Sequence, residues 1–176
     1  MAKTLQVVWN ERIGPEANAR RELPRLTAVF FADVRAALAA RPSPDQLHRV
    51  RLAAKRMRYT LELFRPCYGT GLELRIESLR KLQQVLGEIN DCAATRRVLA
   101  GNIPASPQRI KVERLLASRL RKKTGELRKL WKEELGAPGQ ELRWMRYLAH
   151  NARPPRPAKS PEIHRAKTEK AAEQHR

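Results

Sequence analysis

Apolar residues recur every three or four positions through most of residues 11–150, and no stretch alternates with period two for long. This spacing is typical of amphipathic helices rather than strands. Pro, Gly and Ser residues interrupt the pattern at intervals of about 30 residues. The pattern predicts an all-α fold, an antiparallel bundle of four main helices with a short extra helix and a disordered C-terminal tail.

Local signals set the expected ends of these helices. Ser43 and Gln46 form a capping-box pattern, and Thr70 with Glu73 repeats it. Pro24 predicts a kink or break in the first helix, because proline has no backbone N–H to donate. The expected helices span about 15–40, 43–65, 70–101, 106–135 and 140–149.

The apolar positions of each helix define an expected core face. The second helix contributes Leu47, Val50, Ala54, Met57, Leu61 and Phe64, the third Leu79, Leu82, Leu86 and Ile89, and the fourth Val112, Leu116, Leu120, Leu127, Leu130 and Trp131. In the short helix, an apolar side is expected to be free to pack on another chain. Its members are Leu142, Met145, Leu148 and Ala149.

The composition changes at residue 151. Residues 151–176 contain four prolines and almost no large apolar residue, so they cannot bury enough surface to order themselves. We therefore expect a short N-terminal extension (1–10), a helical domain (11–150) and a disordered basic tail (151–176). The tail has seven Lys or Arg and three Glu, which gives +4 of the net +19 and leaves +15 on the first 150 residues.

The charge excess predicts an anionic partner. The chain has 37 Lys and Arg against 18 Asp and Glu, but only nine aromatic residues. Proteins that stack single-stranded bases need exposed aromatic side chains. The many cations and few aromatic residues fit a ligand made only of phosphates. Nonspecific nucleic-acid binding is the alternative, because any basic protein shares its electrostatic contribution.

The candidate metal ligands and catalytic groups are sparse. Cys67 and Cys92 lie 25 positions apart with no His cluster beside them, so buried, inert thiols are the simpler interpretation. The acids Glu73, Glu77 and Glu88 are not clustered as a metal-dependent hydrolase requires, and no Gly-rich phosphate loop is present. We expect a protein without a cofactor that is not an enzyme. A phosphate-chain enzyme and a purely structural basic protein are minor alternatives.

The chain also lacks the sequence features of membrane insertion. No apolar run approaches the ~20 residues of a membrane helix. The apolar patch from Leu5 to Trp9 is too short for the core of a signal peptide. These observations predict a cytoplasmic protein without a membrane partner.

A line of cations lies beside the apolar stripe of the second helix. It consists of His48, Arg51, Lys55 and Arg58. Arg49 and Arg56 lie farther round the same helix. Like charges at this spacing repel one another by a few tenths of a kcal/mol per pair. Anion binding is therefore favoured over a merely solvated charged face.

The third and fourth helices carry further stripes beside their core faces. The third has Arg80, Gln84, Gly87 and Asp91, and the fourth has Arg114, Arg121 and Arg128 at seven-residue spacing. Gly87 inside a helix costs about 1 kcal/mol relative to Ala, so close packing of a neighbour is expected there. Asp91 is expected to orient a cation of the second helix rather than to act in catalysis. Arg suits oxyanions because its planar fork can bind two oxygens at once.

The second helix has a His-x-x-Arg-x-x-x-Lys-Arg-x-Arg motif over 48–58, and the third has Leu-Gly-x-x-x-Asp over 86–91. Together these motifs resemble the CHAD domain, the conserved-histidine α-helical domain. The resemblance implies an all-helical protein that binds inorganic polyphosphate through basic helix faces, without chemistry of its own. The matching positions are His48, Arg51, Lys55, Arg58, Arg80 and Asp91.

The chain departs from this family in one respect. The family usually has two motif-bearing halves related by pseudo-symmetry, whereas this sequence has one such pair of helices. We therefore expect a groove that is incomplete in the monomer or that two chains complete as a weak homodimer. Association with polyphosphate granules in the cytoplasm is a further expectation.

Overall fold

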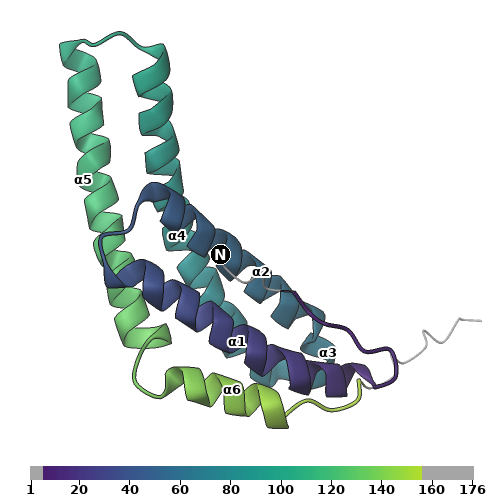
Figure 1. Cartoon of the computed structure of the whole chain (residues 1–176). Coiled ribbons are helices and arrows are strands. Elements are labelled where there is room, and N and C mark those ends of the chain that lie inside the picture. Colours follow the sequence, from purple (N-terminus) through teal and green to yellow (C-terminus); the bar gives the residue numbers. More distant parts are fainter. Residues whose placement is uncertain (1–5, 156–176) are drawn as a thin grey trace, which may run out of the picture.

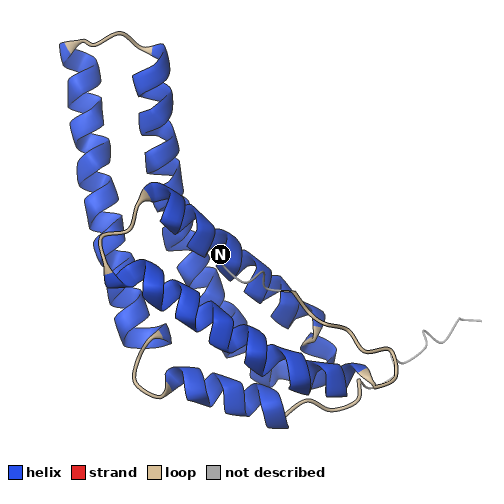
Figure 2. Ribbon diagram, viewed as in Figure 1, coloured by secondary structure: helices blue, strands red, loops and turns tan. Residues whose placement is uncertain are grey.

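The computed structural model describes residues 6–155, which form helices and connections without a strand (Figure 2). The long helices are α1 (Pro15–Ala39), α2 (Pro44–Leu63), α4 (Glu73–Asn102) and α5 (Pro107–Leu130), and α6 (Gln140–His150) is shorter. Shorter turns are α3 (Arg65–Tyr68), the 3-10 turn η1 (Gly69–Leu72) and the π-helical turn η2 (Trp131–Leu135). The predicted all-α fold with four main helices and a short extra helix is confirmed.

The helices form a packed bundle from which a hairpin projects. Within the bundle, α2 packs along α4, and α1 packs against both α2 and α6. The last turns of α4 and the first turns of α5 stand away from α1, α2 and α6 as two adjacent arms (Figure 1). The two arms therefore contact each other rather than the rest of the bundle.

The predicted helix starts are confirmed for α2 and are wrong for α4. Ser43 accepts a hydrogen bond from the backbone N–H of Gln46, and the Gln46 side chain accepts one from the backbone N–H of Ser43. By contrast, Thr70 lies inside η1, and α4 begins after Leu72 without a side-chain cap. Leu72 is fully buried. Packing of this apolar side chain, rather than a hydroxyl cap, fixes the start of α4.

Of the kink or break expected at Pro24, the break does not occur, because α1 continues through this residue. Leu23, Leu26 and Phe30 are all buried on α1, on both sides of the proline. Most helical stability in proteins comes from packing of an apolar face. That packing offsets the hydrogen bond that Pro24 cannot make.

The expected core faces of α2 and α4 are confirmed, since every one of their predicted core residues is buried. Cys67 and Cys92 are buried free thiols, as expected. On α5, however, only Leu127 is buried, and Val112 is 42% exposed. The prediction for Val112 is wrong because this part of α5 belongs to the projecting hairpin.

The apolar side of α6 is not free, contrary to the prediction. Trp144 and Leu148 of α6 are buried, and the helix packs along α1. Of the predicted patch, Leu142 is about half exposed. The folded part also extends slightly beyond residue 150, because Ala152 is buried and the Arg153 N–H donates to the Cys67 carbonyl at 2.8 Å. The rest of the predicted tail, 156–176, lies outside the described residues.

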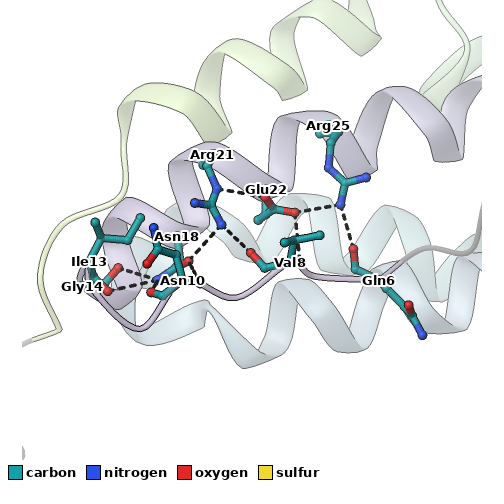
Figure 3. Close-up of polar contacts among 9 residues, drawn as sticks. All are labelled: Gln6, Val8, Asn10, Ile13, Gly14, Asn18, Arg21, Glu22 and Arg25. Atoms are coloured by element: carbon teal, nitrogen blue, oxygen red, sulfur yellow. Dashed lines mark hydrogen bonds and ion pairs between the residues drawn. The ribbon is translucent and has the colours of Figure 1, made fainter.

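A polar network attaches the N-terminal extension to α1 (Figure 3). The Glu22 carboxylate is buried and accepts hydrogen bonds from the Val8 N–H at 3.1 Å, from Arg21 at 3.0 Å and from Arg25 at 2.7 Å. Burial alone would raise the pKa of Glu22. The hydrogen bonds from Arg25, Val8 and Arg21 outweigh it and hold the pKa below its ordinary value.

Asn18 completes this attachment from one turn earlier in α1. Its side chain is fully buried, and its amide N–H group donates to the carbonyls of Asn10, Ile13 and Gly14. Its side-chain oxygen accepts from the Asn10 N–H at 2.9 Å. Residues 6–13 are therefore held to the bundle by buried polar groups.

Across the described residues, no helix is long and apolar enough to cross a membrane.

Candidate functional site

The cation line of α2 lies along the seam between α2 and α4. We call this region the α2/α4 surface. It comprises His48, Arg51, Lys55 and Arg58 of α2 and Arg80, Gln83, Gly87 and Asn90 of α4. The apolar stripe of α2 faces the core, so the neighbouring stripe emerges at the edge of the helix contact. The structure thus brings together cations that the sequence placed on two different helices.

His48 contacts α4 through Asn90. Its Nδ1 lies 3.1 Å from the Asn90 side-chain oxygen, and the imidazole is exposed. In the neutral ring this contact makes Nδ1 the donor, which leaves Nε2 facing other partners. This contact orients the His48 ring at one end of the α2/α4 surface.

Arg58 is held at the other end by several contacts. Its Nε donates to Gln83 at 3.1 Å and its Nη1 donates to Glu62 at 2.6 Å. Gln83 in turn donates to the Ala54 carbonyl at 3.0 Å. The Arg58 guanidinium also lies 4.3 Å from the centre of the Tyr59 ring. These contacts fix the direction of Arg58 before any ligand arrives.

Glu62 joins the two helices by contacting two cations. Its carboxylate lies 2.6 Å from Arg58 and 3.4 Å from Arg80, and Arg80 is also 3.5 Å from Glu77. Ion pairs at exposed positions contribute little to stability. Their main effect here is to compensate part of the positive charge of Arg58 and Arg80.

Arg51 and Lys55 lie between these two ends. Among residues 6–155, no ion pair involves either side chain. Lys55 is exposed, and its Nζ lies 5.6 Å from the centre of the Tyr59 ring. Arg51 is half-buried over α4. The middle of the α2/α4 surface therefore has positive charge that no neighbouring acid compensates.

Gly87 lies under Arg51. A Cβ built at Gly87 would meet Arg51 Nε at 3.9 Å, an ordinary van der Waals distance. The expected neighbour is present, but its packing is loose enough for Ala. Asp91 is exposed, and among the described residues it makes no ion pair with a cation of α2. The adjacent Asn90 makes the contact to α2 instead.

The remaining predicted cations lie elsewhere on the molecule. Arg49 and Arg56 are exposed on α2, outside the contacts that join α2 to α4. Arg121 and Arg128 line a pocket beside the α1–α2 connection, together with Arg41. No member of the α2/α4 surface lines that pocket. Arg114, one heptad before Arg121, is exposed on α5. The predicted site residues are therefore divided between the α2/α4 surface and the pocket, and Arg49, Arg56 and Arg114 belong to neither.

Sequence reasoning missed several polar groups of the α2/α4 surface and the pocket. Gln83 and Asn90 are seven residues apart on α4, a spacing that puts both on the side facing α2. That spacing is a signal that amides line the seam. Arg41 was missed because it lies in a connection, where helical periodicity does not indicate which way a side chain faces.

In the described part of the chain, no three His, Cys, Asp or Glu side chains are placed to hold a metal ion.

Comparison with known protein families finds one match. The family model described as the CHAD domain matches residues 2–100, which include α1, α2 and most of α4. The match therefore covers the α2/α4 surface and stops before α5. No curated protein and no solved structure matches the chain. The family model matches more than half of the residues of this chain. The chain therefore belongs to the CHAD domain family.

Proposed function

We propose that this protein binds inorganic polyphosphate at the α2/α4 surface and performs no chemistry on it. The observation that carries the proposal is the row from His48 to Arg58 on one rigid seam, with Arg51 and Lys55 lacking an acid partner among the described residues. The CHAD family, to which the chain belongs, is associated with polyphosphate binding in general. We place the protein in the cytoplasm, in association with polyphosphate granules.

The geometry of the row suits an extended polyanion. Arg58 lies ten positions after His48, which at about 1.5 Å per position corresponds to about 15 Å of helix. A linear chain of phosphates lying along the seam would contact successive cations. Arg51 offers a planar fork for two oxygens, whereas Lys55 offers a point charge. In this proposal Arg80 contributes from α4, Arg49 and Arg56 widen the surface, and Arg114, Arg121 and Arg128 add long-range attraction.

Nonspecific nucleic-acid binding is the second candidate, and Tyr59 favours it. This side chain is 49% exposed beside Lys55 and Arg58. An exposed aromatic ring next to cations is a feature of surfaces that stack single-stranded bases. However, Arg58 and Lys55 both lie near the ring, which reduces the area left for a base. We therefore rank polyphosphate above nucleic acid.

A competition assay tests the proposal. Labelled polyphosphate bound to the protein is displaced with unlabelled polyphosphate, duplex DNA, single-stranded RNA and heparin at matched charge and several salt concentrations. We expect polyphosphate to compete at least tenfold better than DNA or RNA. Equal displacement by nucleic acid would contradict a specific polyphosphate site.

A double variant locates the site. R51A/K55A is expected to lose at least tenfold in polyphosphate affinity, because charge-assisted hydrogen bonds contribute about 1.5–3 kcal/mol each. The matched control R96A/K111A removes one Arg and one Lys at exposed positions on α4 and α5. It is expected to bind almost as well as the original chain. Equal losses in both variants would show that only total charge matters.

We also infer that a polymer can bring two chains together. One motif-bearing helix pair is present, and the net charge of +15 on the first 150 residues opposes association without an anion. Polyphosphate would neutralise this repulsion. Light scattering is expected to show a monomer or weak dimer alone and two chains per short polyphosphate. One chain per polymer at saturating protein would remove the two-chain arrangement while leaving binding intact.

A further inference from the structure

The pocket that contains Arg121 and Arg128 lies between the α1–α2 connection and the C-terminal half of α5. This pocket has a volume of about 400 Å³, within the range of about 300–1,000 Å³ typical of small-molecule sites. Its walls include Arg41 and Pro42 from the connection, Leu47 from α2, and Leu120, Arg121 and Arg128 from α5. It shares no residue with the α2/α4 surface.

The charged part of the pocket consists of three arginines. Arg41, Arg121 and Arg128 come from two different elements, and none of the residues that line the pocket is acidic. One Nη of Arg128 donates to the Ala40 carbonyl at 2.9 Å, which directs this guanidinium while leaving its other N–H groups for a ligand. Three cations around one hollow repel one another unless an anion lies between them. The charge of the pocket therefore selects for an anionic group.

Most of the remaining wall is apolar, which distinguishes this pocket from a simple phosphate site. The one other polar side chain that lines it is Thr124, whose hydroxyl donates to the Leu120 carbonyl at 2.8 Å. Leu47 is buried, and Leu120 and Pro42 are half-buried. A chain made only of phosphates has no group that gains from contact with these side chains. A ligand with an apolar body would remove their surfaces from water, at about 25 cal/mol per Å². The pocket therefore suits a molecule that is anionic at one end and apolar at the other.

Gly125 keeps one side of the pocket open. This residue lies in the interior of α5, where Gly costs about 1 kcal/mol relative to Ala. A Cβ built there would have no atom within 4 Å, and the residue has no positive φ. Neither packing nor backbone geometry therefore requires Gly at this position. A larger side chain at Gly125 would extend into the space that the pocket leaves open.

We propose that this pocket binds a small organic anion, with an apolar body against Leu47, Leu120 and Pro42 and a phosphate or carboxylate head among the three arginines. This binding site is additional to the polyphosphate site and does not depend on it. The ligand belongs to the class of organic phosphate monoesters or carboxylates. Inorganic phosphate supplies the head alone and is expected to bind weakly.

Calorimetric titration with phenyl phosphate, benzoate and inorganic phosphate tests the ligand class. We expect one phenyl phosphate or benzoate per chain, with the better of the two at least tenfold tighter than inorganic phosphate. The comparison between them identifies the preferred head group. If neither organic anion binds, or if inorganic phosphate binds equally well, the proposal is wrong.

A pair of glycine variants tests the location. Gly125→Leu fills the open side of the pocket and is expected to weaken binding of the preferred organic anion at least tenfold. Gly101→Leu is the matched control, since a Cβ there also has no atom within 4 Å but the position lies outside the pocket. Both variants are expected to retain polyphosphate binding. Equal affinity of both variants for the organic anion would overturn the assignment.

A pair of arginine variants keeps the proposal testable if Gly125→Leu fails to fold. Arg121→Gln is expected to weaken binding of the organic anion at least tenfold. Arg114→Gln removes the same charge from the same line of α5, one heptad away and outside the pocket, and is expected to have little effect. Equal losses in the two variants would show nonspecific attraction to a basic helix and would overturn the pocket.

Discussion

The α2/α4 surface and the α5 pocket contain similar cations with different neighbours. On the α2/α4 surface the cations lie beside Gln83, Asn90 and Glu62, which are polar and exposed or half-buried. In the pocket they lie beside Leu47 and Leu120. The first arrangement favours a ligand that is charged along its whole length, and the second favours one with an apolar part. The neighbours of the arginines, rather than the number of arginines, separate the two ligand classes.

The largest expected effect comes from removing the cations of one region at a time. Replacing Arg51, Lys55 and Arg58 together by Ala should lower polyphosphate affinity on the order of a thousandfold, at about 1.5 kcal/mol for each contact. Fluorescence anisotropy with labelled polyphosphate measures the affinity, and circular dichroism checks that helix content is retained.

The matched variant replaces Arg114, Arg121 and Arg128 by Ala and removes the same charge from α5. We expect a loss of polyphosphate affinity below about tenfold, because only long-range attraction is removed. A loss as large as that of the α2 variant would mean that polyphosphate spans both regions.

Salt concentration should separate the two kinds of ligand. By analogy with counterion release from nucleic acids, five phosphate contacts give a slope of log affinity against log salt of about −3.5 to −4.5. One anionic head in the pocket should give a slope near −1 by the same argument. Titrations between 50 and 200 mM salt measure both slopes. Equal slopes for polyphosphate and the organic anion would contradict the distinction between the two sites.

A smaller effect is expected from removing the acid of the α2/α4 surface. Glu62→Gln should raise polyphosphate affinity several-fold, because Arg58 and Arg80 lose their compensating charge. Glu77→Gln is the milder control, since Glu77 contacts Arg80 alone at 3.5 Å. Affinity for the organic anion should stay unchanged in both variants. A loss of polyphosphate affinity in Glu62→Gln would show that this acid serves mainly to position Arg58.

The smallest expected effect concerns two of the helical glycines, Gly87 and Gly125. Gly87→Ala and Gly125→Ala should each raise the free energy of unfolding by up to about 1 kcal/mol, since a Cβ fits at both positions. Thermal unfolding measures the change. Gly87→Ala should leave polyphosphate affinity nearly unchanged, because Arg51 Nε is 3.9 Å from the added atom. A destabilised Gly87→Ala would reveal tighter packing at this point than the distance indicates.

Much of the fold follows from helical periodicity. The apolar stripe of α2 and the core of α4 are buried as expected, because residues three and four apart share one face of a helix. Ser43 and Gln46 begin α2 as expected, because a capping box depends only on neighbouring residues. The alignment of His48, Arg51, Lys55 and Arg58 beside the apolar stripe has the same local cause.

Other features depended on which elements meet in space. Pro24 lies inside a continuous helix because packing on both sides holds α1 together, and Val112 is exposed because α5 leaves the bundle. Part of the α6 face expected to be free is buried, because α6 packs along α1. In each case the partner is distant in sequence, so periodicity along one helix contains no information about it.

The sequence by itself determined which cations α2 carries and that they share one side of this helix. It also paired the motif on α2 with the motif on α4. Only the tertiary structure decided that Asn90, rather than Asp91, contacts His48, and that Glu62 lies between Arg58 and Arg80. It alone separated Arg121 and Arg128 from the α2/α4 surface and joined them to Arg41. The physical reason is that helical spacing fixes the direction of a side chain relative to its own helix axis, whereas its neighbours depend on how the helices pack.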